Sequence, residues 1–145
     1  MLIPGSLLRI PATLALAAVL APTTSLNAQD EIPEGSTIDS ATFSVFMLYP
    51  QVPPATINAH RITAAWTEMG VTWNNFGGAY DGVVEGSFLA DTLGEYEAMD
   101  LTALVQDWVD GTYPNYGILL EQGEAEFTQL RSREELEYGW PVLEI

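Results

Sequence analysis

The chain has 145 residues, with 20 acidic residues against four arginines, one histidine, no lysine and no cysteine. This length allows one small domain, and the absence of cysteine excludes both a disulfide framework and a Cys/His metal site. The formal net charge of −16 makes nucleic acid and anionic membranes poor partners, because like charges repel.

Residues 1–28 have the layout of a secretory signal peptide. Arg9 precedes an apolar run rich in Leu and Ala, and a small, polar stretch ends at Ala28. The run contains Pro11 and is too short to span a bilayer comfortably. We therefore predict export to the outside or surface of the cell, cleavage after Ala28 and one domain over residues 29–145. The alternative is that the apolar segment forms the first strand or helix of the fold.

All 20 acidic residues follow Ala28, so residues 29–145 carry a formal charge of 3 − 20 = −17. Acidity without lysine suits a surface adapted to salty water. The alternative is that some carboxylates bind a structural Ca²⁺ ion. The candidate ligands are two pairs, neither with EF-hand spacing: Asp107 with Asp110, and Glu124 with Glu126.

The chain beyond residue 35 has the hydrophobic pattern of β-strands. Apolar residues recur at every second position in residues 38–47 and again in residues 55–66, where the phase changes near His60. Short apolar segments bounded by turn residues follow at residues 85–92, 94–101, 116–122, 124–132 and 140–145. Short strands without alternating long helices predict an all-β fold, an antiparallel β-sandwich.

One segment has helical periodicity instead. Within residues 101–111, apolar side chains recur at spacings of three and four, at Leu101, Leu104, Val105 and Trp108. This spacing predicts one short helix that covers an end of the sandwich. Gly111 is the expected stop signal.

Five motifs in register resemble the DNRLRE domain family. They are I-P-x-G-S-T-I-x-S-A-T-F-S at residues 32–44, W-T-E-x-G-V-T-W-N-N at 66–75, D-L-T-x-L-V-Q-x-W-x-x-G at 100–111, N-Y-G-I-L-L at 115–120 and S-R-E at 132–134. The resemblance covers residues 32–145 and implies a jelly-roll-like β-sandwich, usually an accessory module of secreted or surface proteins. Some members of this family act as carbohydrate-binding modules beside polysaccharide-degrading domains.

Domains of this family normally begin with further strands before the segment that starts here at Ile32. In this chain the signal-like segment stands in their place, so we expect a sandwich that lacks its first strands and has an exposed sheet edge. Such an edge can accept a strand from a protein partner or from a second copy of the chain. A further alternative is that the chain is a fragment of a longer gene product.

Several motif residues are interpreted as structural. Trp66 ends an alternating strand and Trp73 follows Val71 on the same face, so both rings are expected in the core. The alternative is that this pair of rings stacks on a sugar. Trp108 is expected in the core on the apolar side of the short helix, and Asp100 of the D-L-T motif is grouped with them.

Arg131 and Arg133 are expected to point to one face near a strand end, beside Glu134. A buried guanidinium there would tie a carboxylate or loop carbonyls across the sandwich. The alternative is that these arginines recognise the carboxylate of a uronic acid, against which the surrounding negative charge argues unless Ca²⁺ bridges the two anions.

Aromatic rings in the predicted turns are the candidates for sugar binding. Rings on loops can present flat faces to sugar C–H groups, while nearby Asn and Asp side chains bind hydroxyls. These candidates are Phe76, Tyr80, Tyr113, Tyr116 and Trp140, with Tyr138 close to the last of them.

No catalytic site is predicted. The carboxylates are too numerous for any pair to be singled out, and His60 lies mid-strand in a chain without a nucleophile motif. We therefore predict a secreted, non-catalytic module that binds a polysaccharide or a cell-surface glycan. The alternative is a structural or adhesive domain that binds a protein partner through an open sheet edge. A row of exposed rings favours the first function, and a bare strand edge favours the second.

Overall fold

The computed structural model describes residues 8–10, 16–18, 32–33, 35–50, 52–123, 127–134 and 138–145. Its strands are β1 (Leu8–Ile10), β2 (Leu16–Ala18), β3 (Thr42–Tyr49), β4 (Ala55–Arg61), β5 (Gly86–Ala90), β6 (Tyr96–Asp100), β7 (Ile118–Gln122), β8 (Thr128–Leu130) and β9 (Val142–Glu144). Its helices are α2 (Trp73–Phe76) and α3 (Thr102–Val109). Among these residues no helix is both long and apolar enough to cross a membrane.

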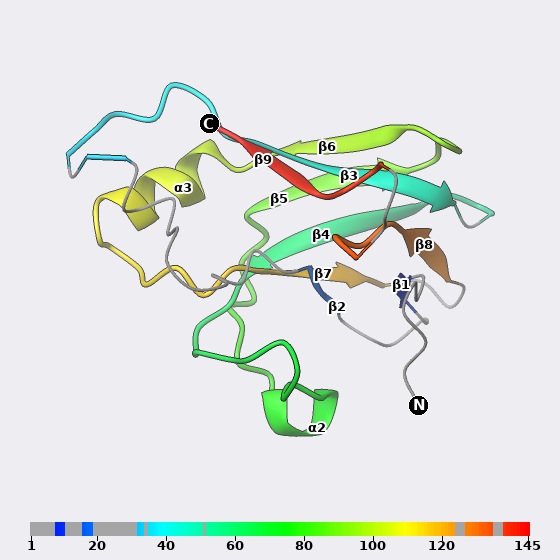
Figure 1. Ribbon diagram of the computed structural model, residues 1–145, viewed down its shortest axis with the longest axis horizontal. Helices are drawn as coiled ribbons and strands as arrows, with labels where there is room; N and C mark the ends of the chain where they lie inside the picture. The colour runs from blue at the N-terminus through cyan, green and yellow to red at the C-terminus, as the bar shows by residue number, and fades with distance from the viewer. Residues whose placement is uncertain are drawn as a thin grey trace.

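The strands form two antiparallel sheets, which confirms the predicted sandwich. One sheet has the order β1-β8-β3-β6, and the other has the order β2-β7-β4-β5. Strand β3 shares one of its edges between two partners, because β9 pairs with Thr42–Ser44 and β8 pairs with Met47 and Tyr49. In Figure 1, β3, β6 and β9 lie in one layer and β4 and β7 in the other, with α3 at one end.

The main core lies between the two sheets. Phe43, Val45 and Met47 of β3 are buried, and they meet Ile57 of β4 and Leu120 of β7 from the opposite layer. Successive residues of a strand face opposite sides, so the period of two in the sequence selects these inward side chains. Burial of this apolar surface is the main favourable term in folding.

Helix α3 closes one end of the core as predicted. Its buried side is made of Leu104, Val105, Trp108 and Val109. Gly111 has a φ of 70°, and its N–H donates to the carbonyl oxygen of Trp108 at 3.2 Å. This left-handed conformation favours glycine, which explains why the helix ends here.

Polar residues of α3 hold the segment that leads into β3. Gln106 accepts a hydrogen bond from the Ile38 amide at 2.8 Å and donates to the Ser36 carbonyl at 3.1 Å. The Thr102 hydroxyl accepts from the Ala41 amide at 2.9 Å. The D-L-T-x-L-V-Q and S-T-I-x-S-A motifs are therefore the two sides of one contact.

Asp100 organises the start of the same helix. Its Oδ1 atom accepts hydrogen bonds from the Thr102 hydroxyl at 2.5 Å and from the Thr102 amide at 2.8 Å. These bonds lower the pKa of Asp100, because they stabilise the ionised carboxylate. Asp100 therefore has a structural role, because its carboxylate stabilises the first turn of α3.

Two short strands lie within the segment that resembles a signal peptide. β1 pairs with β8, with Leu8 opposite Leu130, and β2 pairs with β7, with Leu16 opposite Leu120. These pairings agree with the alternative in which the apolar segment forms strands of the fold, whereas cleavage after Ala28 stays a prediction. In this chain β1 covers one edge of β8 and β2 covers one edge of β7.

The second alternating segment is shorter than predicted. It was expected to continue to Trp66, but β4 ends at Arg61 and only Ile62 continues, as a single bridge to Tyr80. The amide of Ile62 donates to the carbonyl of Gly117 at 3.1 Å. From Thr63 onward the chain leaves the sheet.

A shortened chain that starts at Gln29 lacks β1 and β2, so the outer edges of β7 and β8 lose their hydrogen-bonding partners. We expect this chain to associate with itself or to melt at a lower temperature than the full chain, because open strand edges accept other strands. Light scattering coupled to chromatography across a dilution series, with the full chain as control, measures this. A stable monomer at every concentration would contradict the expectation.

Candidate functional site

The segment between β4 and β5 covers the outer face of the β4–β7 sheet. Ile62, Phe76 and Leu119 form a second hydrophobic cluster, separate from the main core. Leu119 lies between two inward residues of β7, so its side chain points to the opposite face. Helix α2 consequently lies outside the two layers (Figure 1). Partly buried side chains complete this cluster: Trp66, Val71, Ala79, Tyr80 and Tyr116.

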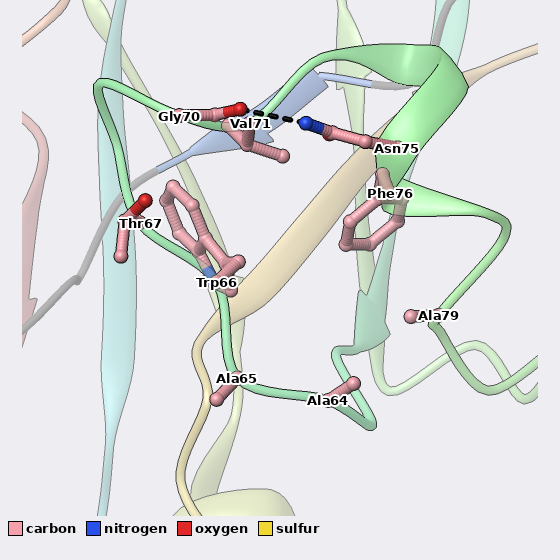
Figure 2. Close-up of a pocket in the computed structure, with 9 residues that line it drawn as sticks. All are labelled: Ala64, Ala65, Trp66, Thr67, Gly70, Val71, Asn75, Phe76 and Ala79. Carbon is pink, nitrogen blue, oxygen red and sulfur yellow. Dashed lines mark hydrogen bonds between the residues drawn. The ribbon is translucent and has the colours of Figure 1, made fainter.

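A pocket of about 350 Å³ opens within this segment (Figure 2). Its apolar lining comes from Ala64, Ala65, Trp66, Val71, Phe76 and Ala79, and the remainder comes from Thr67, Gly70 and Asn75. The rings of Trp66 and Phe76 stand on opposite sides of it in Figure 2. This volume lies near the lower end of the range of roughly 300–1,000 Å³ for small-molecule pockets.

The indole of Trp66 is fixed by one hydrogen bond. Its Nε1–H donates to the carbonyl oxygen of Tyr116 at 2.8 Å, just before β7 begins. A partly buried indole N–H needs such an acceptor. The bond joins the W-T-E-x-G-V-T-W-N-N motif to the N-Y-G-I-L-L motif and holds one wall of the pocket.

Asn75 fixes the other side of the pocket loop. Its Oδ1 accepts from the Thr72 amide at 2.6 Å, and its own amide N–H donates to the Thr72 hydroxyl at 3.3 Å. This reciprocal pair is a capping box that starts α2. The Asn75 Nδ2 group also donates to the Gly70 carbonyl at 2.7 Å, as Figure 2 shows.

Gly70 allows the turn that precedes α2 to be tight. A Cβ atom at this position would lie 2.6 Å from Thr67 Oγ1. The amides of Gly70 and Val71 both donate to the Thr67 carbonyl, at 3.0 and 2.9 Å. The glycine therefore leaves space for the Thr67 hydroxyl at the pocket.

The S-R-E motif braces this loop from the other sheet. Arg133 forms ion pairs with Glu68 of the pocket loop and with Glu134, the second at 3.1 Å. Arg131 donates from Nη1 to the Tyr138 carbonyl at 2.8 Å. Both arginines lie beyond the end of β8 rather than in the strand, and Arg133 is exposed. Each nonetheless makes the type of contact expected of a structural clamp, to a carboxylate or to a loop carbonyl.

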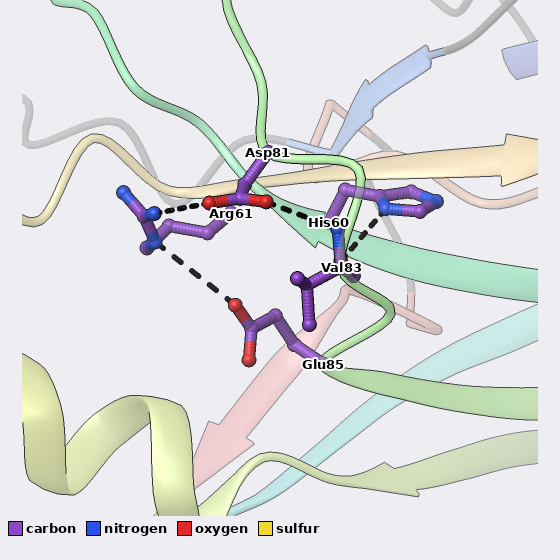
Figure 3. Close-up of polar contacts among 5 residues, drawn as sticks. All are labelled: His60, Arg61, Asp81, Val83 and Glu85. Atoms are coloured by element: carbon purple, nitrogen blue, oxygen red, sulfur yellow. Dashed lines mark hydrogen bonds and ion pairs between the residues drawn. The ribbon is translucent and has the colours of Figure 1, made fainter.

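A second polar cluster holds the loop that leads into β5 (Figure 3). Buried Arg61 contacts Asp81 at 2.6 Å and Glu85 at 4.0 Å, and its guanidinium carbon lies 3.8 Å from the ring centroid of Tyr113. The cation covers a face of Tyr113 that sugar stacking would need. Burial raises the pKa of Glu85, partly offset by Arg61 and reinforced by the charges of Asp81 and Asp107.

His60 is a buried strand residue, as expected. Its Nδ1 lies 2.9 Å from the Val83 carbonyl oxygen, and its Nε2 lies 3.0 Å from the Glu121 carboxylate. Both ring nitrogens have partners, so the contacts of His60 are those of a residue that holds β4, β7 and the Val83 loop together.

The predicted sugar-binding rings do not form one row. Phe76 is buried, and its ring lies nearly parallel to that of Tyr80, with centroids 6.4 Å apart. Tyr116 packs against the second cluster. Tyr113 lies against Arg61, and Trp140 is exposed just before β9. Of the five, only Phe76 lines the pocket.

The two tryptophans of the W-T-E motif differ from the expectation. Trp66 lies in a loop, not at the end of a strand, and forms a partly buried wall of the pocket. The core position expected for Trp73 is wrong, because Trp73 is 45% exposed at the start of α2. The capping box begins a helix there, so the spacing of two from Val71 no longer places both on one face. Trp108 is buried as expected.

Sugar stacking was the alternative for Trp66, but the sequence did not indicate that Thr67 and Asn75 line the same pocket. A usable signal was the Thr72-x-x-Asn75 spacing, which resembles a capping box and predicts a helix start rather than a strand.

One metal candidate has another contact, and one pair lies outside the described residues. The Asp110 carboxylate accepts a hydrogen bond from Gln106 Nε2 at 2.9 Å. At Asp107 it is the backbone carbonyl, not the carboxylate, that accepts from the Thr112 amide at 2.9 Å. Glu124 and Glu126 are not among the described residues. Within the part of the chain that is described, no group of three or more acidic or histidine side chains could hold a metal ion. Structural Ca²⁺ stays a prediction.

The sequence model of carbohydrate-binding module family 96 matches residues 29–145, and the chain belongs to this family. The predicted carbohydrate-binding function is thereby confirmed, and modules of this kind are generally non-catalytic. No curated protein and no solved structure matches the chain.

Three tryptophan-to-alanine variants test the assignment of scaffold and surface. We expect Trp108→Ala to lower the free energy of unfolding by about 3–5 kcal/mol, because a large buried ring is lost. Trp73→Ala should change it by less than about 0.5 kcal/mol, as is usual for surface positions. Trp66→Ala should fall between them. Urea denaturation measures all three, and a loss for Trp73→Ala as large as that for Trp108→Ala would overturn the assignment.

Glu85 should make stability depend on pH in a predictable direction. Its folded-state pKa is raised, so its stabilising contribution is present below its unfolded pKa of about 4.3 and is lost as pH rises through the folded value. The melting temperature of Glu85→Gln relative to the wild type should therefore be higher at about pH 7 than at about pH 4. Glu95→Gln, which removes an exposed carboxylate, controls for the change in net charge. An equal pH response of both variants would contradict the expectation.

Proposed function

We propose that this member of carbohydrate-binding module family 96 binds a sugar unit of its glycan in the pocket between Trp66 and Phe76, without catalysis. The observation that carries the proposal is the combination of two aromatic walls with hydrogen-bonding groups in one pocket. Apolar walls with a few placed polar groups are the usual composition of a small-molecule site.

The chemistry of a sugar matches this lining. Its ring faces carry C–H groups, which can pack on Trp66, Val71 and Phe76, while its hydroxyls need donors and acceptors at the edge. The Thr67 hydroxyl can both donate and accept, and Asn75 has a second Nδ2 hydrogen besides the one directed at Gly70. The bonds that fix these groups in the free protein reduce the entropy lost on binding.

The charge around the pocket favours a neutral sugar. The residues that line it are all uncharged, and Arg133, which contacts the pocket loop, is paired with Glu68 and Glu134. An anionic uronate would enter the field of a chain whose net charge is −16. Repulsion of this kind lowers both the association rate and the affinity.

The module is proposed to act outside the cell or at its surface. The signal-like layout of residues 1–28 supports export, and extracellular polysaccharide is then the accessible ligand. The DNRLRE resemblance is compatible with this role.

Replacement of an alanine by phenylalanine, once at the pocket and once away from it, tests the proposed site. Ala64 lines the pocket and is exposed, so Ala64→Phe should fill the pocket without disturbing the core. We expect this variant to lose sugar binding by about tenfold or more, which corresponds to about 1.4 kcal/mol. The measurement is a glycan array followed by calorimetry with the best short oligosaccharide, with and without Ca²⁺.

The matched control is Ala103→Phe, an exposed position on α3 away from the pocket lining. It should bind as the wild type does. Wild-type affinity in Ala64→Phe, or an equal loss in both variants, would reject the pocket as the sugar site. Dependence of wild-type binding on Ca²⁺ would support the predicted ion.

A second candidate function is binding of a protein partner through a sheet edge. It is favoured by the strand pairings of β1 with β8 and of β2 with β7, because removal of β1 and β2 would open two edges with apolar neighbours. The dilution series on the chain that starts at Gln29 bears on this candidate directly.

A further inference from the structure

Two exposed tyrosines, Tyr96 and Tyr138, pack against the buried ring of Phe46 in the other half of the sandwich, and exposed Trp140 follows two residues after Tyr138. Tyr96, Tyr138 and Trp140 are 47%, 53% and 48% exposed. Phe46 packs edge-on against Tyr96 at 5.3 Å and against Tyr138 at 5.7 Å. The Tyr96 hydroxyl donates to the Trp140 carbonyl at 3.3 Å. These three residues are called the aromatic surface below.

Arg131 contacts the aromatic surface at Tyr138. Its guanidinium carbon lies 4.2 Å from the ring centroid of Tyr138 and 5.2 Å from that of Phe46. The same side chain donates to the Tyr138 carbonyl. A cation against aromatic faces, combined with a charge-assisted hydrogen bond, fixes both the backbone and the ring of Tyr138.

Gly139 lets the chain pass close to this arginine. A Cβ atom there would lie 2.5 Å from the Arg131 Cδ atom and 3.2 Å from the Phe46 ring, and the φ of 87° also disfavours other residues. Tyr138 and Trp140 therefore flank a glycine that both the close approach and the positive φ require. Neighbouring exposed rings are the kind of surface that interaction sites of soluble proteins use.

We propose that the aromatic surface is a second carbohydrate contact, which binds the apolar face of a polysaccharide chain. Ring faces can pack on sugar C–H groups, and the tyrosine hydroxyls can bond to sugar hydroxyls. The ligand class follows from membership of a carbohydrate-binding family, and the location is independent of the pocket.

A second contact outside the pocket favours a polysaccharide over a single sugar, because only a glycan chain can bind at two places. Arg131 contacts the aromatic surface, and Arg133, two residues later, pairs with Glu68 of the pocket loop. Residues 131–133 therefore connect the two regions through the backbone. Linked contacts raise the overall affinity far above that of either contact alone.

The test compares short and long glycans on full-length variants. The probes are soluble neutral polysaccharides, such as mixed-linkage β-glucan, xylan and galactomannan, together with the disaccharide unit of whichever the wild type binds best. Affinity electrophoresis measures the polysaccharide, and calorimetry measures the disaccharide. The variants are Trp140→Leu and Tyr96→Leu with Trp140→Leu, which keep apolar volume but remove the rings.

We expect Trp140→Leu to weaken polysaccharide binding by about threefold or more and the double variant by about tenfold. Disaccharide affinity should not change, whereas the pocket variant Ala64→Phe should weaken both. Tyr49→Ala removes a ring that is 55% exposed elsewhere and stacks on Phe127, and it is the matched control. Thermal melting must show that each variant is folded, and Trp140→Tyr, which retains a ring, should restore binding.

Polysaccharide affinity of the double variant equal to that of Tyr49→Ala would overturn the inference while leaving the pocket in place. Loss of self-association instead of polysaccharide binding would also overturn it, because the surface would then serve protein contacts. If Ala64→Phe keeps disaccharide binding while the double variant loses polysaccharide, the pocket assignment fails and the aromatic surface stands. Absence of wild-type binding to every neutral polysaccharide would reject the inference.

Discussion

The pocket depends on the packing of one outward-facing side chain, Leu119 of β7. Its neighbours in the strand fill the main core, while Leu119 gives the loop between β4 and β5 an apolar surface on which Ile62 and Phe76 can pack. The Trp66–Tyr116 hydrogen bond then fixes the position of the loop relative to the start of β7. Without this second cluster the loop would have nothing to bury, and a long surface loop with little buried area is not held in one conformation.

The five sequence motifs are joined in pairs by side-chain contacts. Gln106 and Thr102 hold the segment before β3, Trp66 reaches the start of β7, and Arg133 pairs with Glu68. Each contact joins residues that are far apart in the chain and on different elements. The motif residues therefore make the contacts that join distant elements of one sandwich. The order of the motifs along the chain follows from the order of these elements.

Much of the fold could be predicted because apolar residues recur with different periods in its strands and in its longer helix. The alternation in β3 and the three-and-four spacing in α3 identify both elements, and Trp108 was placed in the core on that basis. The candidate site was harder to predict. Trp73 and Phe76 lie in a single helical turn, and the Thr72–Asn75 capping pair decides where this turn begins. A helix of one turn is too short to show a hydrophobic period in the sequence. The covering of Tyr113 by Arg61 arises only from the tertiary fold.

The division of one β3 edge between β9 and β8 has a consequence for how the protein folds. Thr42 pairs with Glu144 and Met47 with Leu130, so an early strand finds these neighbours only among the last strands of the chain. During synthesis the edge of β3 at Thr42–Ser44 stays unpaired until residues 142–144 have left the ribosome. Contacts of such long sequence separation slow folding, and until they form the unpaired edge of β3 can accept a strand from another chain.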